Sequence, residues 1–309
     1  MKIRYNKYSD YLLKRYGEKV YKLPIKLSGT CPNRDEENIG CHFCGEEGGS
    51  FENLDPAMDV KNQLKTNKEY ISKKYNSNKF IAYFQNYTNT YMSFSIFKES
   101  IYSSISDDIV AIYISTRPDC ITNDQLAFLN RIKLEYDLDI VMEIGLQTSN
   151  YKVLNRINRG HGLAEFIDAV NRCKSHGIDI CTHVLIGLPG DEILDTIETS
   201  KIVSALKVDQ IKLHALYILK NTEFGKQYLD HKLDLISKEE YIERVILFLR
   251  YLSPEVVVQR LIGRSPLEDS LFSNWSTSWW KIQDEIINIM ELNNFYQGDL
   301  FDYLVPKEV

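Results

Sequence analysis

The sequence predicts an α/β fold: a partial (β/α)6 barrel of the TIM-like kind, followed by a C-terminal α/β extension. Six short apolar segments rich in β-branched and aromatic residues alternate with segments of helical pattern, and repeated strand–helix units form a parallel sheet. No glycine fingerprint for dinucleotide binding follows the first strand, which favours a barrel over a doubly wound sheet. The cysteines and the charged and polar residues that could bind cofactors or take part in catalysis fall at or just after strand ends, where barrels place their active sites.

Each expected strand is apolar enough to be covered on both faces. The six strands are expected at 22–29, 79–85, 109–116, 138–148, 178–187 and 209–218. Helices are expected near 55–75, 94–106, 122–136, 150–156, 163–176 and 191–205, and several of them open with Asp, Ser, Thr or Asn, the favoured N-cap residues. The pattern then changes, with a helix at 235–252, a strand and glycine-bearing turn at 254–266, and a final helix within 274–298. We therefore divide the chain into a basic segment leading into the first strand (1–27), the barrel (22–222) and an extension packed on it (223–309).

Composition limits the function classes. The 309 residues, 44% of them hydrophobic, can bury a substantial core. No apolar run reaches the roughly 18–20 residues that span a bilayer, and the N-terminus lacks the apolar stretch of a signal peptide, so we expect a cytoplasmic protein with no membrane association. In that compartment thiols stay reduced, and clustered cysteines are expected to be metal ligands or catalytic groups.

The net charge of −6 argues weakly against non-specific nucleic-acid binding. Basic residues nevertheless gather in two places, which permits local basic surface or, equally, the solvated faces of surface helices. The first group is Lys2, Arg4, Lys7, Lys14, Arg15, Lys19, Lys22 and Lys26, and the second is Lys61, Lys65, Lys68, Lys73, Lys74 and Lys79.

Three of the six cysteines, Cys31, Cys41 and Cys44, lie in one loop directly after the first expected strand. A structural zinc would need a fourth ligand, and His42 is poorly placed between two of the cysteines. An electron-transfer iron–sulfur cluster also has four protein ligands. Three thiolates therefore indicate a cubane cluster with one iron left open to a ligand. Of the isolated thiols, Cys120 lies just beyond a strand end and is a candidate catalytic residue, although a buried inert thiol is the alternative.

The loop CPNRDEENIGCHFC, with Phe43 before its last cysteine, resembles the cluster loop of the radical S-adenosylmethionine (SAM) enzymes. Their usual pattern is Cys-x3-Cys-x2-Cys, and the longer first spacing is similar to the subgroup of the elongator protein-3 radical domain. CPNRD followed by CHFC resembles specifically its YhcC/YtqA (MnmL) branch. The resemblance implies a [4Fe-4S] cluster on the three cysteines, with SAM at the open mouth of a six-unit partial barrel.

Further segments resemble the family in the same order along the chain. They are YFQNYTNTY (83–91), STRPDC (115–120), EIGLQT (143–148), NRINRGH (155–161), HVLIGLPGD (183–191) and KLHALYILKNT (212–222). The resemblance implies cofactor-binding roles for Phe43, Gln85, Asn86, Ser115, Glu143, Gln147, Arg159, His183 and Leu216. Gln85 and Asn86 replace small residues of relatives, so we expect contact with the SAM amino group through the backbone. Arg159 is expected to hold the SAM carboxylate and His183 to lie near the ribose.

Two of these residues also carry an expectation from physical chemistry alone. Glu143 stands in the apolar run VMEIGL, where burial without a partner is costly, and a site role is therefore favoured over a paired structural carboxylate. His183, like His214, lies on an apolar strand, where a satisfied core histidine is as good an interpretation as a ligand contact.

The family resemblance implies that SAM chelates the open iron through its amino and carboxylate groups and is cleaved to a 5′-deoxyadenosyl radical, with an electron donor such as flavodoxin or ferredoxin. It further implies action on the wobble uridine of tRNA, converting 5-carboxymethylaminomethyluridine to 5-aminomethyluridine. The two basic groups, with Arg260 and Arg264, would then contact RNA. Two alternatives stay open: a radical SAM enzyme acting on a small metabolite or peptide, and a non-catalytic zinc-bearing RNA-binding module.

Overall fold

The computed structural model describes residues 3–34, 40–45, 54–75, 77–264 and 270–304. Its helices are α1 (Tyr8–Tyr16), α2 (Val60–Tyr75), α3 (Phe94–Ser103), α4 (Asn123–Tyr136), α5 (Tyr151–Arg156), α6 (Leu163–Ser175), α7 (Ile193–Ala205), α8 (Glu223–Leu229), α9 (Lys238–Tyr251) and α10 (Trp279–Leu292). The strands are β1 (Val20–Ile25), β2 (Lys79–Phe84), β3 (Ile109–Thr116), β4 (Asp139–Gln147), β5 (Asp179–Ile186), β6 (Gln210–Ala215), β7 (Ile218–Leu219), β8 (Val257–Arg260) and β9 (Ser270–Phe272).

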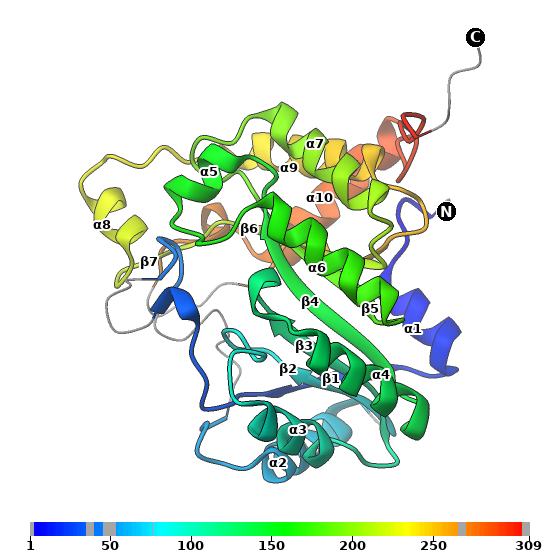
Figure 1. Ribbon diagram of the computed structural model, residues 1–309. Helices are drawn as coiled ribbons and strands as arrows, with labels where there is room; N and C mark the ends of the chain where they lie inside the picture. The colour runs from blue at the N-terminus through cyan, green and yellow to red at the C-terminus, as the bar shows by residue number, and fades with distance from the viewer. Residues whose placement is uncertain (1–2, 35–39, 46–53, 76, 265–269, 305–309) are drawn as a thin grey trace.

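The main sheet is parallel, with strand order β1-β2-β3-β4-β5-β6-β8. It curls into a half-barrel whose outer face is covered by helices, including α3, α4 and α6 (Figure 1). The predicted partial barrel is confirmed, and each of the six expected strands is present within a few residues of its expected bounds. None of the helices in the described part of the chain combines the length and hydrophobicity that crossing a bilayer requires.

Strand residues alternate between the two faces of the sheet, as the pleat requires. The outward side chains pack with the helices in one large core that includes Ile112, Ile140 and Ile180. The inward face starts apolar, with Ile81, Ala111 and other residues around α1 at the end where the strands begin. Farther along the strands, the inward side chains become polar. The fold thus closes one end of the barrel with hydrophobic packing and leaves polar groups facing the other.

Two departures from the predicted elements lie at the N-terminus and at the end of the last barrel strand. Residues 8–16 form a helix, where we expected only a basic segment, because Tyr8, Tyr11, Leu12 and Tyr16 share one face that packs against the barrel. The last expected strand, 209–218, ends at Ala215, and β7 pairs instead with β9 in a small antiparallel sheet.

Within the C-terminal extension, β8 joins the main sheet beside β6 as a seventh parallel strand. Residues 265–266 of the predicted 254–266 segment, and Lys2 of the first basic group, lie outside the described residues. The extension is therefore continuous with the barrel wall through β8, which brings Arg260 level with Lys212 of β6.

Candidate functional site

A cavity of about 840 Å³ opens at the carboxyl ends of the strands. Most of the predicted site residues line this cavity. They are Cys31, Cys41, Cys44, Phe43, Gln85, Ser115, Glu143, Gln147, Arg159, His183 and Leu216. Two do not line it. Asn86 is buried beside the cavity wall, and Cys120 lies with its Sγ 3.8 Å from Asp119 Oδ1. Burial, assisted by Asp119, raises the pKa of Cys120 to about 12, which disfavours the nucleophilic thiolate.

The cysteine loop is held by backbone hydrogen bonds: the Arg34 N–H donates to the Cys31 carbonyl at 2.7 Å, and the Cys44 N–H donates to the Cys41 carbonyl at 2.9 Å. Side-chain donors also form hydrogen bonds with the sulfurs. Cys41 Sγ accepts hydrogen bonds from Asn33 Nδ2 at 3.4 Å and from Arg159 Nη1 at 3.5 Å. Burial, with the neighbouring Cys41, raises the pKa of Cys44 to about 11. Hydrogen-bond donors around these thiols, of which Cys41 is buried and Cys31 and Cys44 are partly buried, suit a metal cluster, which binds the cysteines as thiolates.

His42, the nearest alternative fourth ligand, does not line the cavity. Its ring packs edge-on against Phe224, with the centroids 5.9 Å apart, and its backbone N–H donates to the Ile157 carbonyl. This contact turns the imidazole toward α8. Among the described residues that line the cavity, three thiols are thus available to one cluster, without the histidine that would complete a zinc site.

Arg159 provides a fixed positive charge beside the cysteine loop. It is 8% exposed; its Nη2 donates to the Gly145 carbonyl at 3.2 Å, and its Nε is buried with no hydrogen-bond partner in the described structure. A Cβ on Gly145 would lie 2.6 Å from Arg159 Nη2, so the glycine makes room for the guanidinium. A buried guanidinium with an unsatisfied donor fits a carboxylate ligand such as that of SAM.

The floor of the cavity is an ionic network around Glu143, whose side chain is fully buried. Its carboxylate lies 2.7 Å from Lys22 Nζ, 2.5 Å from Lys212 Nζ and 2.9 Å from His183 Nε2. Burial alone would raise the pKa of Glu143, but the charges of Lys212 and Lys22 hold it well below its ordinary value. Burial, with Lys212, lowers the pKa of His183 to about 4. Glu143 is therefore a charged group and His183 a neutral one at neutral pH.

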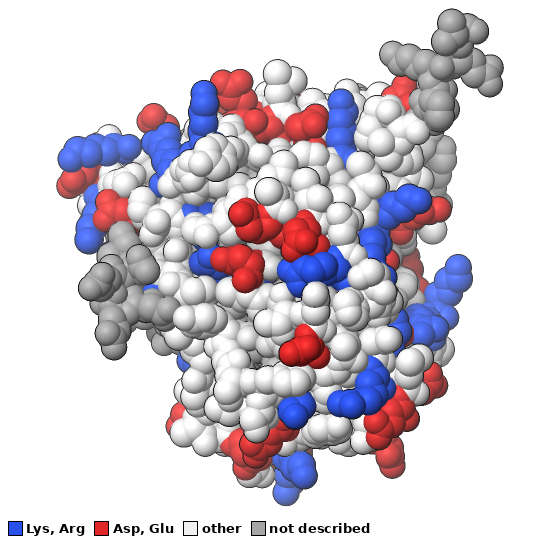
Figure 2. All heavy atoms as spheres, in the orientation of Figure 1, with Lys and Arg blue, Asp and Glu red and all other residues white. Residues whose placement is uncertain are grey.

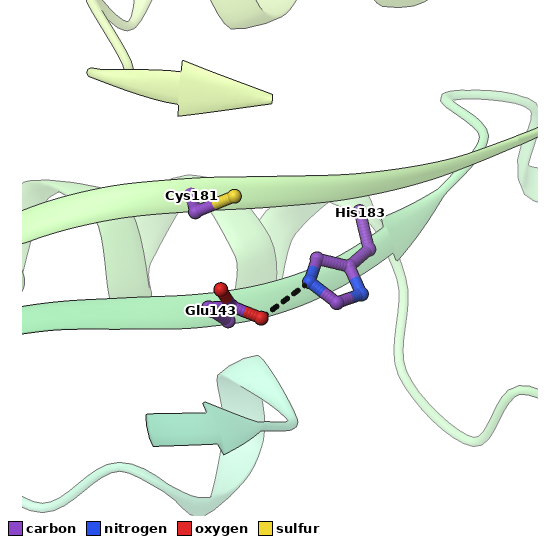
Figure 3. Close-up of side chains that lie close together, drawn as sticks. All are labelled: Glu143, Cys181 and His183. Atoms are coloured by element: carbon purple, nitrogen blue, oxygen red, sulfur yellow. Dashed lines mark hydrogen bonds and ion pairs between the residues drawn. The ribbon is translucent and has the colours of Figure 1, made fainter. Parts of the chain in front are cut away.

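The network also contains a group of potential metal ligands among the described residues: Glu143, Cys181 and His183, with ligand atoms within 4.8 Å of one another. Figure 3 shows Cys181 and His183 on one strand facing Glu143 on its neighbour. The two lysine ammonium groups already neutralise this carboxylate and would repel a cation. Burial also raises the pKa of Cys181 to about 12. The electrostatics therefore favour an internal ion-pair network over a metal site.

Lys22 shows where sequence reasoning failed. We expected it among the RNA-contacting residues of the N-terminal segment, and this is wrong, because its ammonium lies inside the barrel, 4.2 Å from the centroid of the Tyr113 ring. Burial lowers its pKa to about 8, although Glu143 opposes the change. Lys212, which we did not predict, could have been found as a lysine within the apolar run IKLHAL, where a charge needs a partner.

Other members of the first basic group are also engaged. Arg15 forms two hydrogen bonds with Asp139, at 2.7 and 2.8 Å, and Arg4 donates to Asn294 and to the Phe295 carbonyl. These contacts dock the N-terminal segment onto the barrel and the C-terminal region. The basic composition of residues 1–27 therefore serves internal packing in part.

Another side of the cavity is built by β6, by β8 with the segment after it, and by α10. Arg260, Arg264 and Trp279 line it together with His214. The Arg264 guanidinium lies 5.6 Å from the Trp279 ring centroid, and Arg260 Nη2 lies 2.8 Å from each ring nitrogen of His214. This wall combines cations with an aromatic ring, a combination suited to anionic or planar ligands.

Comparison with known proteins agrees with this geometry. The family model for the radical SAM superfamily matches residues 25–202, and that for the radical SAM C-terminal domain matches residues 208–291. The Bacillus subtilis (strain 168) protein YtqA is 34% identical over 97% of this chain and 94% of its own length. The Escherichia coli (strain K12) protein YhcC is 30% identical over 89% of this chain and 88% of its own.

Two further comparisons concern proteins of Methanocaldococcus infernus. The solved structure of the archaeal Methanocaldococcus infernus Elp3 with an N-terminal deletion superposes with a TM-score of 0.68 at 17% identity, covering 93% of this chain and 68% of that one. A protein named tRNA uridine(34) acetyltransferase, from Methanocaldococcus infernus, is 24% identical over 52% of this chain and 30% of its own length. Together with the cysteine loop and the cavity, these matches show that the chain is a radical SAM enzyme that uses a [4Fe-4S] cluster and S-adenosylmethionine, and that it belongs to the elongator protein-3-like YhcC/YtqA branch of the radical SAM superfamily.

Proposed function

We propose that this enzyme modifies the wobble uridine of tRNA in the cytoplasm, converting 5-carboxymethylaminomethyluridine to 5-aminomethyluridine. One observation carries the proposal: a single cavity joins the cysteine loop to a wall of Arg260, Arg264 and Trp279. The first end suits the cofactors and the second suits a planar base with an anionic substituent. The similarity to a protein named tRNA uridine(34) acetyltransferase supports the choice of RNA.

Each end of the cavity has a defined task in this proposal. Cys31, Cys41 and Cys44 would hold the cluster, and Arg159 would pair with the SAM carboxylate. When bound, the two cofactors would supply a radical that takes a hydrogen from the carboxymethyl carbon of the substrate. Return of one electron from the substrate radical to the redox partner would leave a protonated imine, and addition of water to the imine would release the 5-aminomethyl group and glyoxylate. The protein would contribute the orientation of cofactor and substrate within the cavity. Reduction of the cluster would come from a donor such as flavodoxin or ferredoxin.

The RNA is expected to approach where the cavity opens between β1 and β8. Lys22 of β1 reaches Gln259 of β8 at 2.8 Å deep in this gap. At its margin, the Tyr75 ring stacks on Tyr21 of β1 with the centroids 4.7 Å apart, so the end of α2 lies beside the β1 edge of the sheet. Lys73, Lys74 and Tyr75 thus place cations and an aromatic ring beside the opening, as single-stranded RNA recognition requires.

The described residues of the helical face show no comparable concentration of cations. Figure 2 shows acidic and basic side chains interspersed over the face that carries α4, α6 and α7. Mixed charge gives little net attraction for a phosphate backbone. We therefore assign the RNA to the cavity margin, and a wobble base would leave its stack to enter.

The experiment is a wobble-nucleoside analysis with and without the protein. Transfer RNA from cells lacking it should accumulate 5-carboxymethylaminomethyluridine, and the purified, reduced enzyme with SAM should convert that nucleoside in vitro. The Cys41→Ala variant is the matched inactive control. An unchanged nucleoside profile together with turnover of SAM that does not depend on RNA would favour a small-molecule or peptide substrate. A colourless protein containing zinc would favour the non-catalytic module.

A further inference from the structure

The side of the cavity formed by β6 and β8 contains an arginine that the cofactors do not require. We propose that Arg260, positioned by His214, binds the carboxylate of the substituent on the substrate base and thereby selects carboxymethylated uridine. This inference rests on the proposed function and extends it by naming the group that the enzyme reads. It makes Arg260 a specificity-determining residue.

The first argument is the local geometry of Arg260. Its Nη2 lies 2.8 Å from both ring nitrogens of His214, while its Nε is buried and has no hydrogen-bond partner in the part of the chain that the structure describes. A guanidinium can bind a carboxylate through two parallel N–H donors. The histidine thus fixes one end of the group, and a ligand would satisfy the other.

The second argument is the charge of the surroundings. No carboxylate of the described residues lies within ion-pair distance of Arg260, whereas Arg117 is paired with Asp119 at 2.6 Å. Glu143 is the one acidic residue among the described residues that line the cavity, and Lys22 and Lys212 already neutralise it. An anion entering this half of the cavity would therefore meet a cation without an acidic competitor.

His214 contributes its position and its lack of charge. It lies on β6 inside the barrel, and its ring is 5.3 Å from that of His183 at an angle of 32°. Burial, with Arg260, lowers the pKa of His214 well below its ordinary value. A neutral imidazole accepts a hydrogen bond from the guanidinium and adds no repulsion. Gly263 lies beside the pair, where a Cβ would make ordinary contacts with His214 Nδ1 at 3.4 Å and Arg260 Cζ at 3.5 Å.

The third argument is that two other arginines already contact the cysteine loop. Arg159 and Arg34 lie beside the cysteine loop: Arg159 contacts Cys41, and Arg34 donates to the carbonyl oxygens of Cys44 and Gly45. Arg260 is on β8, which is separated from β1 by the opening of the half-barrel. The volume of about 840 Å³ is near the upper end of the roughly 300–1,000 Å³ of small-ligand pockets. It leaves room for a base beside SAM.

The test uses two anticodon stem-loops that are identical except at the wobble base, one with 5-carboxymethylaminomethyluridine and one with 5-aminomethyluridine. Binding to the oxidised, cluster-loaded enzyme with SAM is measured by fluorescence anisotropy, so that no turnover occurs. The wild type should bind the carboxymethylated stem-loop about 10- to 100-fold more tightly, the range expected of a charge-assisted hydrogen bond. Arg260→Gln should abolish this preference, and Arg260→Lys should retain part of it.

Arg131→Gln, which alters an exposed arginine on α4, is the matched control and should leave the preference unchanged. Visible absorbance of the cluster and SAM binding report whether each variant is folded. Equal weakening of both stem-loops by Arg260→Gln would mean that Arg260 contacts phosphate, and would overturn the proposal. So would a wild type that binds both stem-loops equally or neither. Discrimination without conversion would refute the proposed reaction alone, and conversion without discrimination would refute the carboxylate subsite alone.

Discussion

Lys212 on β6 and Glu143 on β4 form an ion pair inside the barrel, with Nζ and Oε2 2.5 Å apart. The strands that carry them are separated by β5, so the pair links inward side chains across the curled sheet. Lys22 adds a second ammonium from β1 at 2.7 Å. The ion pairs at the floor of the cavity therefore connect strands that are distant in the sequence.

Glu143→Gln should destabilise the protein by about 3–5 kcal/mol, because two buried ammonium groups lose their carboxylate. Urea denaturation under anaerobic conditions measures the change in the free energy of unfolding. Glu135→Gln, at an exposed position on α4, is the control and should change it by less than about 0.5 kcal/mol. Equal stabilities for the two variants would show that Glu143 has no such role.

Asp191→Asn should stabilise the protein increasingly as the pH rises. Burial raises the pKa of Asp191 to about 7, although a hydrogen bond from Thr148 opposes this. The folded state thus prefers the protonated carboxyl, whose contribution is complete below the unfolded pKa of about 3.9 and is lost as the pH rises through 7. Asparagine stays neutral, so its advantage over the wild type should grow between pH 4 and pH 8 to about 4 kcal/mol, at about 1.36 kcal/mol for each unit by which the pKa is raised.

Thermal denaturation of both proteins across that pH range measures the difference. Asp107→Asn, in an exposed turn, serves as the control and should show no such trend. A difference between Asp191→Asn and the wild type that is constant with pH would contradict the raised pKa.

Replacing any one of Cys31, Cys41 and Cys44 with alanine should abolish stable cluster binding and SAM cleavage, since the cavity offers the cluster these three thiols. Iron content and visible absorbance after anaerobic reconstitution measure the loss. Cys173→Ala is the control, because Cys173 is buried in the hydrophobic core, and it should retain the cluster. Full SAM cleavage by any of the three loop variants would disprove its assignment as a ligand.

Gly145→Ala should weaken SAM binding while leaving the cluster in place. The added methyl group would lie 2.6 Å from Arg159 Nη2 and 2.8 Å from Gln147 Nε2, so the flexible ends of these side chains must move. Displacing one charge-assisted contact should raise the dissociation constant about tenfold, which equilibrium dialysis measures. Gly29→Ala introduces a methyl group at an ordinary 3.7 Å contact and should have little effect. Unchanged affinity in Gly145→Ala would argue against Arg159 as the carboxylate partner.

Local patterns predicted the parts of this protein that depend on local sequence. The six strands were visible as apolar runs, and the cysteine spacing located one end of the cavity, because both signals lie within short segments. The direction in which a charged side chain points was not visible. Lys22 was predicted to lie on the surface as an RNA contact, yet it forms an ion pair with Glu143, which is 121 positions away in the sequence. That pairing depends on how the sheet curls.

The same limit applies to the side of the cavity that β6 and β8 form. Arg260 was identified as a potential RNA contact, but its partner His214 was treated as an isolated strand histidine, and the two are joined only because β8 aligns beside β6. The helix at Tyr8–Tyr16 was not predicted, because the lysines and arginines of this region led us to describe it only as a basic segment. Its apolar face nevertheless follows the helical period. The pairing of strands that are distant in the sequence therefore determines which of these side chains contact one another, and the local sequence pattern did not reveal it.

The most direct test of the proposed function is deuterium transfer from the substrate. The reduced enzyme is incubated with SAM and tRNA whose wobble 5-carboxymethylaminomethyluridine carries deuterium on the carboxymethyl carbon, and the 5′-deoxyadenosine is analysed by mass spectrometry. Our account predicts one deuterium in 5′-deoxyadenosine, together with formation of 5-aminomethyluridine. Unlabelled 5′-deoxyadenosine, formed in equal amounts with and without the RNA, would contradict it.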